Sequence, residues 1–492
     1  MLVVSDSASE RRAYWASLAA VVVLHLGILW IPAYNALVDF PFHLGRAWVL
    51  YTYDRTPFFQ ATFARVLDPM PNLAIDLIVP PLLYVLPPIV AGKVFLSSIV
   101  LLFALGCHLL AVTVYGRPSW AAPLAAFAVT NSAFLYGFVN SAFSTALFLV
   151  AFAVWLRLRP KWTAASWLAV AALATATYIA HLSGFVFLGL AMGVCWLLSL
   201  PQSRRIRISD LLDFSVLLPA LLIQAYPWAN RVRIAGNIDW GSFFKKVLGV
   251  GSVFIGFHYV LSVCTIVLFV AAFAIAAARG KPRIERLFFW LGAAFAVAAI
   301  ACPSRLTAGG GAEADTRFFP PAFVFFVLSF TAVKRPAVTR LALPLAFAAM
   351  LLRLGDVGWT LARNGASAEQ QVAALAKAAP DSRIYEFYVS PAGYQAKKLT
   401  RGNLNLPCYS LFLTQSVTSV FFAVRGVQPI YFRDPNWPLP WLAPSLAYLD
   451  AHSQMFDYVW GCNLGKTERD YLERKATLVS TGDACELWKL KK

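Results

Sequence analysis

The sequence predicts a mainly α-helical bundle that crosses a membrane many times and carries a C-terminal α/β domain. Of its 492 residues, 59% are hydrophobic and only 13% are charged, whereas soluble domains carry about 25% charged residues. The apolar residues also fall into long runs, and an α-helix needs about 20 such residues to cross the hydrocarbon core. These observations exclude a large soluble enzyme.

The apolar runs define a predicted transmembrane domain over residues 1–358. Eleven candidate spans cover residues 14–34, 89–115, 119–136, 138–156, 162–180, 183–200, 211–227, 252–278, 287–302, 318–333 and 337–355. The first run is too long for a cleaved signal peptide and lacks a good cleavage site, so we expect it to be the first transmembrane helix. The stretch 72–88 is apolar but contains four prolines, which favours a re-entrant or interfacial segment.

Positive charge predicts the orientation of the bundle. Arg11 and Arg12 precede the first span, and short basic loops follow spans two, four, six, eight and ten. If the spans alternate, all of these residues lie on one side, which is then the cytoplasmic side. The net charge of +18 is therefore mostly a topology signal. Nucleic-acid binding is not expected, because the basic residues are spread over separate loops.

An odd number of spans places residues 359–492 on the extracytoplasmic side. There, "SAEQQVAALAKAAPDSRIYEFYVS" reads as an amphipathic helix, a turn and a strand. Two further strands, "FDYVWGC" and "CELWKLK", flank a helix at "KTERDYLERKA". An oxidising compartment permits a disulfide between Cys462 and Cys485, and free buried thiols are the alternative.

The first outer loop, predicted over 35–88, places ionisable residues directly after the first span. Asp39 precedes a predicted helix that opens with "FPFHLGRAW", because proline is tolerated in a helix's first turn. His43 and Arg46 follow at offsets that lie near one helix face. The alternative is that Asp39 only caps the helix, as aspartate commonly does.

Other polar residues are expected on the same outer side and, together with Arg46, at one pocket. These are Asn140, His181, His258, Arg305, Asp315 and Arg317. Each alone is more often structural, but ionisable residues at membrane depth are costly and tend to be functional. The sequence contains no P-loop, H-E-x-x-H, G-x-S-x-G or C-x-x-C motif.

The whole pattern resembles the GT-C superfamily of membrane glycosyltransferases. The resemblance rests on the acid after the first span, the long helical first loop, the inner basic loops and the outer α/β domain. The runs "VDFPFHLGR" and "YGFVNSAFSTALFLVAFAVWLR" are similar to uncharacterised bacterial members. The resemblance implies a multi-pass protein of the bacterial inner membrane with a periplasmic C-terminal domain. It also implies inverting transfer of a sugar from a polyprenyl-phosphate donor to a glycan, lipid or protein.

The resemblance also implies roles for particular residues. Asp39 corresponds to the acid that is the catalytic base or positions the acceptor, and we expect it to be the base. From its own chemistry, His43, one turn away, is expected to share the proton or orient the acid. Arg305 and Arg317 are expected to hold the lipid phosphate. Many members carry a second acid beside the first, but Phe40 follows Asp39 here, so Asp68 and Asp76 are the candidates for that acid.

Three questions stay open at the level of sequence. A divalent metal ion is compatible with Asp and His ligands, but their spacing is not diagnostic. A transporter or lipid flippase is a rival class, although no internal repeat is evident and the charges lie at the rim. A non-catalytic, GT-C-like scaffold subunit is the other alternative, because the acidic pair is missing.

Overall fold

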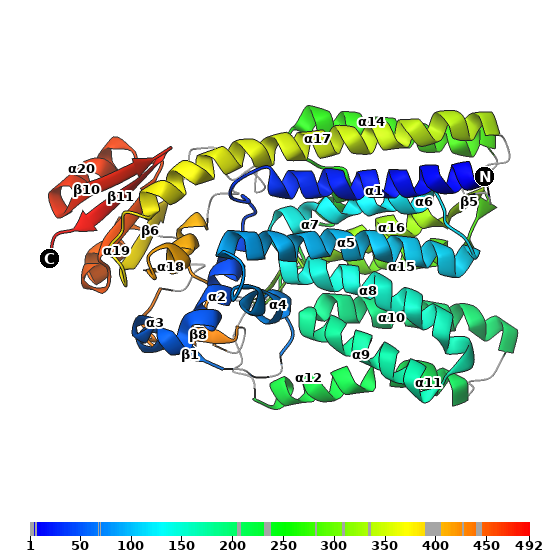
Figure 1. Ribbon diagram of the computed structural model, residues 1–492, viewed down its shortest axis with the longest axis horizontal. Coiled ribbons are helices and arrows are strands. Elements are labelled where there is room, and N and C mark those ends of the chain that lie inside the picture. The colour runs from blue at the N-terminus through cyan, green and yellow to red at the C-terminus, as the bar shows by residue number, and fades with distance from the viewer. Residues whose placement is uncertain are drawn as a thin grey trace.

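A computed structural model describes residues 4, 7–66, 68, 70–203, 208–230, 238–280, 283–307, 310–332, 336–388, 405–425, 428–438 and 445–492. Within these ranges, six helices are long and apolar enough to cross a membrane. They are α1 (Ala8–Trp30), α5 (Pro88–Tyr115), α8 (Val139–Leu158), α10 (Leu182–Ser203), α14 (Tyr259–Gly280) and α17 (Pro336–Leu375). They lie roughly parallel, with the N-terminus at one end and the C-terminal domain at the other (Figure 1).

Shorter apolar helices complete the bundle. They are α6 (Ala121–Ala126), α7 (Ser132–Leu135), α9 (Ala164–Ala180), α15 (Arg286–Ala301) and α16 (Phe319–Ser329). Phenylalanine rings from α8, α10, α15 and α16 fill the centre, where Phe148 contacts Phe187, Phe295 and Phe325. Such aromatic clusters bury large apolar areas. The predicted mainly α, polytopic bundle is therefore confirmed, while the count of eleven spans stays a prediction.

Two expected spans are not single helices. The run 119–136 divides into α6, a 3₁₀ turn (Phe127–Thr130) and α7, with an extended backbone at Asn131. The run 211–227 divides into α11 (Ile208–Ser215) and α12 (Leu218–Asn230). Pro219 lies in the first turn of α12. Proline has no backbone N–H and disfavours helical geometry in the residue before it, so the helix breaks there.

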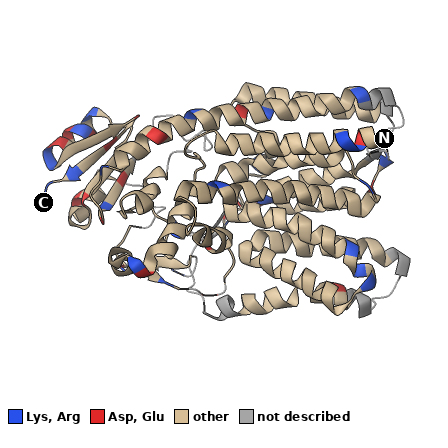
Figure 2. Cartoon of the chain, in the orientation of Figure 1, with Lys and Arg blue, Asp and Glu red and all other residues tan. Residues whose placement is uncertain are grey.

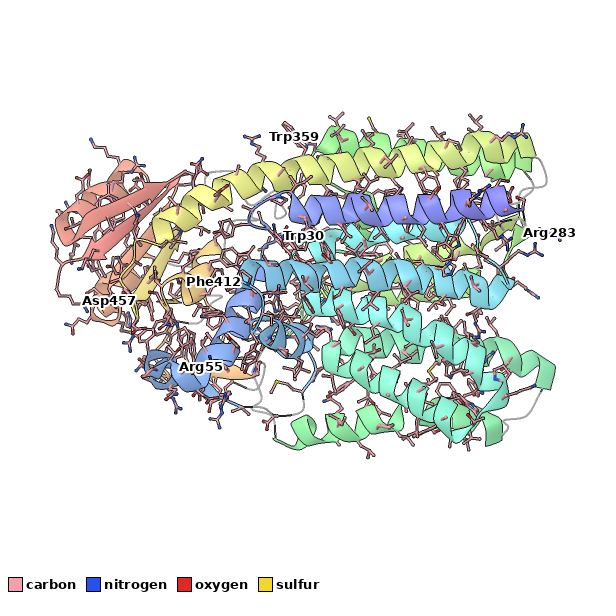
Figure 3. The ribbon with its side chains drawn as sticks, viewed as in Figure 1. Trp30, Arg55, Arg283, Trp359, Phe412 and Asp457 are labelled. Carbon is pink, nitrogen blue, oxygen red and sulfur yellow. A yellow bond between two sulfur atoms is a disulfide. The ribbon has the colours of Figure 1, made fainter. Side chains whose placement is uncertain are left out.

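Charge separates the two ends of the bundle. Lys and Arg on the bundle gather mainly at the end with the N-terminus, and the helices between the two ends are almost entirely uncharged (Figure 2). At the opposite end, here called the domain end, Trp30 of α1 and Trp359 of α17 lie at a similar level (Figure 3). Their side chains are 44% and 71% exposed. Exposed tryptophans at one level are typical of a membrane–water interface.

The first loop folds back over the domain end of the bundle. It forms α2 (Phe40–Thr52), the 3₁₀ turn η1 (Tyr53–Arg55), α3 (Pro57–Thr62), β1 (Phe63–Arg65) and α4 (Ala74–Leu82). The predicted helix after Asp39 is thus present, with Pro41 in its first turn. The segment 72–88 forms the nine-residue α4 and a turn before α5, which is too short to cross a bilayer.

The C-terminal residues form a five-stranded sheet in the order β10-β11-β9-β6-β7. Its strands are β6 (Arg383–Tyr388), β7 (Val417–Thr418), β9 (Tyr458–Cys462), β10 (Ala476–Gly482) and β11 (Cys485–Leu490). The predicted strands β6, β9 and β11 and the helix α20 (Lys466–Lys475) are present, while β7 and β10 were not expected. Cys462 and Cys485 face each other across β9 and β11 and form a disulfide.

Two connections join this sheet to the rest of the chain. Helix α17 has 40 residues, about 60 Å of helix, so it runs along the bundle and continues to the sheet (Figure 1). It passes through the predicted domain boundary at 358/359 without a break. In addition, β8 (Ile430–Phe432) pairs antiparallel with β1 of the first loop. The first loop and the C-terminal region therefore fold together over the domain end.

Candidate active site

Asp39 lies where the chain leaves α1 and enters α2, and a tight backbone contact fixes it there. Its backbone N–H donates to the carbonyl of Tyr136 over 2.9 Å. Gly137, at a φ of 82°, packs against this backbone, and a Cβ at Gly137 would lie 2.6 Å from the nitrogens of Asp39 and Phe40. Only glycine combines that φ with so close an approach. The turn before α8 therefore sets the position of Asp39.

The carboxylate of Asp39 does not cap α2, although Asp39 is its N-cap residue. Instead, Oδ1 accepts a hydrogen bond from Nδ2 of Asn405 at 3.2 Å. The alternative that Asp39 only caps its own helix is therefore not what the structure shows.

Arg317 is the charged neighbour of Asp39. It lies in the 3₁₀ turn η5 (Asp315–Phe318), directly before α16. Burial raises the pKa of Asp39 to about 7, and the positive charge of Arg317 acts in the opposite direction. Burial lowers the pKa of Arg317 to about 10, a value at which the guanidinium keeps its charge at neutral pH. The sequence separated these two residues by 278 positions, and the fold brings them together.

His181 holds Arg317 from the other side. Nη1 of Arg317 lies 3.0 Å from Nε2 of His181, and the guanidinium carbon lies 4.8 Å from the centre of the Phe138 ring. Guanidinium can only donate, so Nε2 accepts from Arg317. Nδ1 lies 2.9 Å from Oγ of Ser183 and 3.0 Å from the backbone nitrogen of Ser183, which donates to it. Burial, Arg317 and His43 all lower the pKa of His181 well below its usual range. A neutral imidazole therefore orients the guanidinium.

Arg46 and Asp76 form a buried ion pair next to this cluster. Nε and Nη2 of Arg46 donate to the two carboxylate oxygens of Asp76, both over 2.7 Å, and the side chains are 1% and 2% exposed. Nη2 of Arg46 also lies 3.1 Å from Nδ1 of His43. Burial is the main cause that lowers the pKa of His43 well below its usual range, and the positive charge of Arg46 acts in the same direction. The pair ties α2 to α4, and each carboxylate oxygen of Asp76 accepts a hydrogen bond from Arg46. The role of Asp76 as a second acid stays a prediction.

Asn140 and Asp315 also hold the framework. Asn140 accepts from the backbone N–H of Ile75 at 2.9 Å and donates to Asn72, so it anchors the start of α4 on α8. Asp315 accepts from Oγ of Ser304 and from the N–H of Thr316, which fixes η5 and with it Arg317. Both side chains thus hold the framework, and their expected place at an outer-face pocket stays a prediction.

Three other expected site residues lie elsewhere. His258 pairs with Asp356 of α17 in a surface groove of about 740 Å³ that also contains Trp359. Arg305 lies on β3 (Arg305–Thr307), with an exposed side chain, and its backbone pairs with Asp239. Asp68 lies between β1 and α4 and is partly buried.

A small cavity and a larger groove lie near the segment that contains Arg317. A cavity of about 10 Å³, roughly the volume of one water, is lined by Arg317, Asn131 and Ser141. A much larger groove of about 530 Å³ extends along α16 from Phe319 to Phe330, between α14, α15 and α17. Its walls are almost wholly apolar and include Phe273 and Phe323. Phe319, which lines this groove, lies two residues after Arg317 in the sequence.

A metal centre finds no support in the part of the chain that the structure describes. Within those residues, no group of three or more His, Cys, Asp or Glu side chains is placed to hold a metal ion. The charge at the candidate site is instead supplied by a guanidinium.

Comparisons with known proteins identify the fold. No protein-family model matches the chain, and no curated protein matches it. Among solved structures, ArnT from Cupriavidus metallidurans bound to undecaprenyl phosphate has a TM-score of 0.54, with 98% of both chains covered. The chain shares the fold of this ArnT. The apo state of the same ArnT gives a TM-score of 0.53 with the same coverage, and the identity is 12% in both cases. At this identity the likeness to ArnT shows the fold, which confirms the predicted GT-C-like architecture of a membrane protein.

Sequence reasoning missed two parts of the site. Asn405 lies 366 residues from Asp39, in a stretch without a motif, and nothing in the sequence pointed to it. Phe138 and Gly137 were within a quoted run, "YGFVN". A glycine between two aromatic residues at the start of a span was a signal for a close backbone contact.

Proposed function

We propose that this protein is a glycosyltransferase that moves a sugar from a polyprenyl-phosphate donor to an acceptor at the domain end of the bundle. The observation that carries the proposal is that Asp39, whose carboxylate makes no cap hydrogen bond, lies within electrostatic range of the Arg317 guanidinium, which contacts His181. Support comes from the fold, because the ArnT structure of the same fold was solved with undecaprenyl phosphate bound. We further propose that the domain end is periplasmic and that the membrane is the bacterial inner membrane.

The chemistry follows from these two groups. An acceptor hydroxyl attacks the anomeric carbon of the donor sugar, a new glycosidic C–O bond forms, and the bond to the phosphate oxygen breaks with inversion. Asp39 takes the hydroxyl proton, and a carboxyl with a pKa of about 7 is suited to that task near neutral pH. The prenyl phosphate leaves with its negative charge, which Arg317 neutralises through charge-assisted hydrogen bonds.

The apolar groove along α16 fits the lipid part of the donor. An isoprenoid chain is apolar and long, and the groove of about 530 Å³ is lined almost wholly by apolar side chains. It starts at Phe319, so a chain inside it would place its phosphate at Arg317. His43 is held neutral next to Arg46, and we assign it to orient the acceptor rather than to carry charge.

The proposal is tested in a strain that lacks the chromosomal gene and carries a plasmid copy. Mass spectrometry compares envelope lipids and glycans from cells with wild-type protein and with Asp39→Asn. We expect a product that is heavier by one sugar only with wild-type protein, while both proteins reach the membrane at equal levels. A product that Asp39→Asn restores fully would instead favour a scaffold subunit.

A further inference from the structure

The C-terminal region contacts Asp39 through the side chain of Asn405, which is 5% exposed. Its Nδ2 donates to the carbonyl oxygen of Val38 at 2.9 Å and to Oδ1 of Asp39 at 3.2 Å. Both partners accept hydrogen bonds, so the amide must present its NH₂ group and both hydrogens are used. This double contact fixes the amide orientation.

Tight packing of α2 against the C-terminal region fixes the position of Asn405. Asn405 leads into the 3₁₀ turn η8 (Leu406–Tyr409), and its carbonyl accepts from the N–H of Cys408 at 3.1 Å. A Cβ on Gly45 of α2 would lie 2.5 Å from Leu411 and 3.0 Å from the carbonyl of Cys408. The two segments are thus in direct backbone contact, and Asn405 has little freedom to move away from Asp39.

We propose that Asn405 is a positioning residue for Asp39, which holds Oδ1 so that Oδ2 is the oxygen that takes the proton from the acceptor. Among the described residues, Oδ1 is the oxygen of Asp39 with a hydrogen-bond partner. This inference rests on the proposed function. It means that a residue from the C-terminal region completes a site whose other members come from the transmembrane part.

The contact has an electrostatic consequence. An N–H that donates to a carboxylate favours its ionised form, so Asn405 acts in the same direction as Arg317 and against the burial that raises the pKa of Asp39. Burial keeps the other titratable groups around it neutral, by lowered pKa values for His43 and His181 and raised ones for Cys408 and Glu386. Removal of the Asn405 amide therefore raises the pKa of Asp39.

The test is an infrared titration of purified, full-length protein in lipid nanodiscs. The carbonyl band of protonated Asp39 is the band that Asp39→Asn removes, and its midpoint is followed with pH. We expect Asn405→Ala to raise the midpoint by about one to two pH units. Asn436→Ala is the matched control, because Asn436 is exposed on the same C-terminal region, and its midpoint should equal that of the wild type.

The rate of sugar transfer is measured against pH on the same proteins. The acid limb for Asn405→Ala should move up with the infrared midpoint, so that activity lost at pH 7 returns at higher pH. A residue that only stabilises the fold would lower the rate equally at every pH. If Asn405→Ala does not give a monodisperse protein, Asn405→Ser takes its place, because a serine hydroxyl is too short to reach both partners.

The outcomes separate this inference from the proposed function. An unchanged midpoint in a folded Asn405 variant overturns the positioning role, whatever the activity. A raised midpoint in a protein whose wild-type form transfers no sugar overturns the proposed function. A raised midpoint with a matching shift of the acid limb supports both.

Discussion

At the scale of single residues, the site depends on ionisable groups whose neighbours decide their charge. Asp39 is driven toward its protonated form by burial, while Arg317 opposes that effect. His43 and His181 are held neutral, so they accept hydrogen bonds from guanidinium groups. The arrangement leaves one base and one cation in a largely desolvated place, where charge interactions are stronger than in water.

Asp39 should make the stability of the protein depend on pH. Burial raises its pKa from 3.8 to about 7, so the folded protein holds a proton that the unfolded chain releases between these values. Its contribution to stability is full below about pH 4 and is lost as the pH rises through 7. The side chain of Asp39→Asn is uncharged at every pH, so this variant does not lose stability through the ionisation of residue 39. Thermal unfolding of purified protein measures this effect. The melting temperature of Asp39→Asn minus that of the wild type should be larger at pH 8 than at pH 4. An equal difference at the two pH values would contradict the burial of the charge.

The two arginines that the sequence proposed for the phosphate should behave differently. Arg317 is buried beside Asp39 and oriented by His181, so Arg317→Ala should lower the transfer rate by about 10²–10³, as loss of a donor to developing negative charge does. Arg305 is exposed on β3, and Arg305→Ala should change the rate by less than about threefold, since its charge is screened by water. Initial rates of sugar transfer at a saturating acceptor concentration measure the effect of each substitution. Equal losses in rate would show that Arg305 also holds the phosphate.

At the scale of elements, the first loop is held on the bundle by buried polar contacts between helices. The ion pair of Arg46 and Asp76 joins α2 to α4, and Asn140 joins α4 to α8. Lys93 of α5 donates to the carbonyls of Trp30 and Pro32 at the end of α1. These contacts position the segment that carries Asp39.

Breaking the buried pair should be costly. Asp76→Ala leaves the Arg46 guanidinium buried without its partner, which destabilises by about 3–5 kcal/mol. The double variant Arg46→Met, Asp76→Leu removes both charges and should recover most of that loss. Chemical denaturation in detergent measures both free energies of unfolding. If the double variant is as unstable as Asp76→Ala, the pair contributes through packing and not through charge.

The groove along α16 predicts a lipid-binding phenotype. Ala322 lines the groove and is 5% exposed, so Ala322→Trp should fill part of the space and raise the KM for the lipid donor by about tenfold, a loss of about 1.4 kcal/mol in binding. The matched control is Val297→Trp, because Val297 is 64% exposed on the outside of α15. Steady-state kinetics with varied donor gives the two KM values. An unchanged KM for Ala322→Trp would place the isoprenoid elsewhere.

At the scale of the whole molecule, hydropathy predicted the class of architecture because runs of apolar residues translate directly into helices. It did not predict that 211–227 is broken at Pro219, or that α17 continues from the bundle to the C-terminal sheet. Local pattern also identified β6, β9 and β11, but not β10, whose "ATLVSTG" has a mostly exposed pattern.

The site was only partly predictable, for a physical reason. The sequence indicated Asp39 and Arg317 because charges are rare in this chain and conspicuous at the ends of spans. The sequence could not show that Asp76 forms an ion pair with Arg46, or that Asn140 anchors α4, since these contacts depend on which helices pack together. Asn405 comes from a distant segment, and contacts of this kind exist only in the folded chain.

The base assigned to Asp39 has a direct test in vitro. Membranes from the deletion strain supply both donor and acceptor, purified protein is added, and mass spectrometry follows the sugar-modified product with time. With Asp39→Asn, the initial rate should fall by about 10²–10⁴ relative to wild type, the usual contribution of a positioned base, while the protein stays folded. A rate for Asp39→Asn within a few-fold of the wild-type rate would contradict the account.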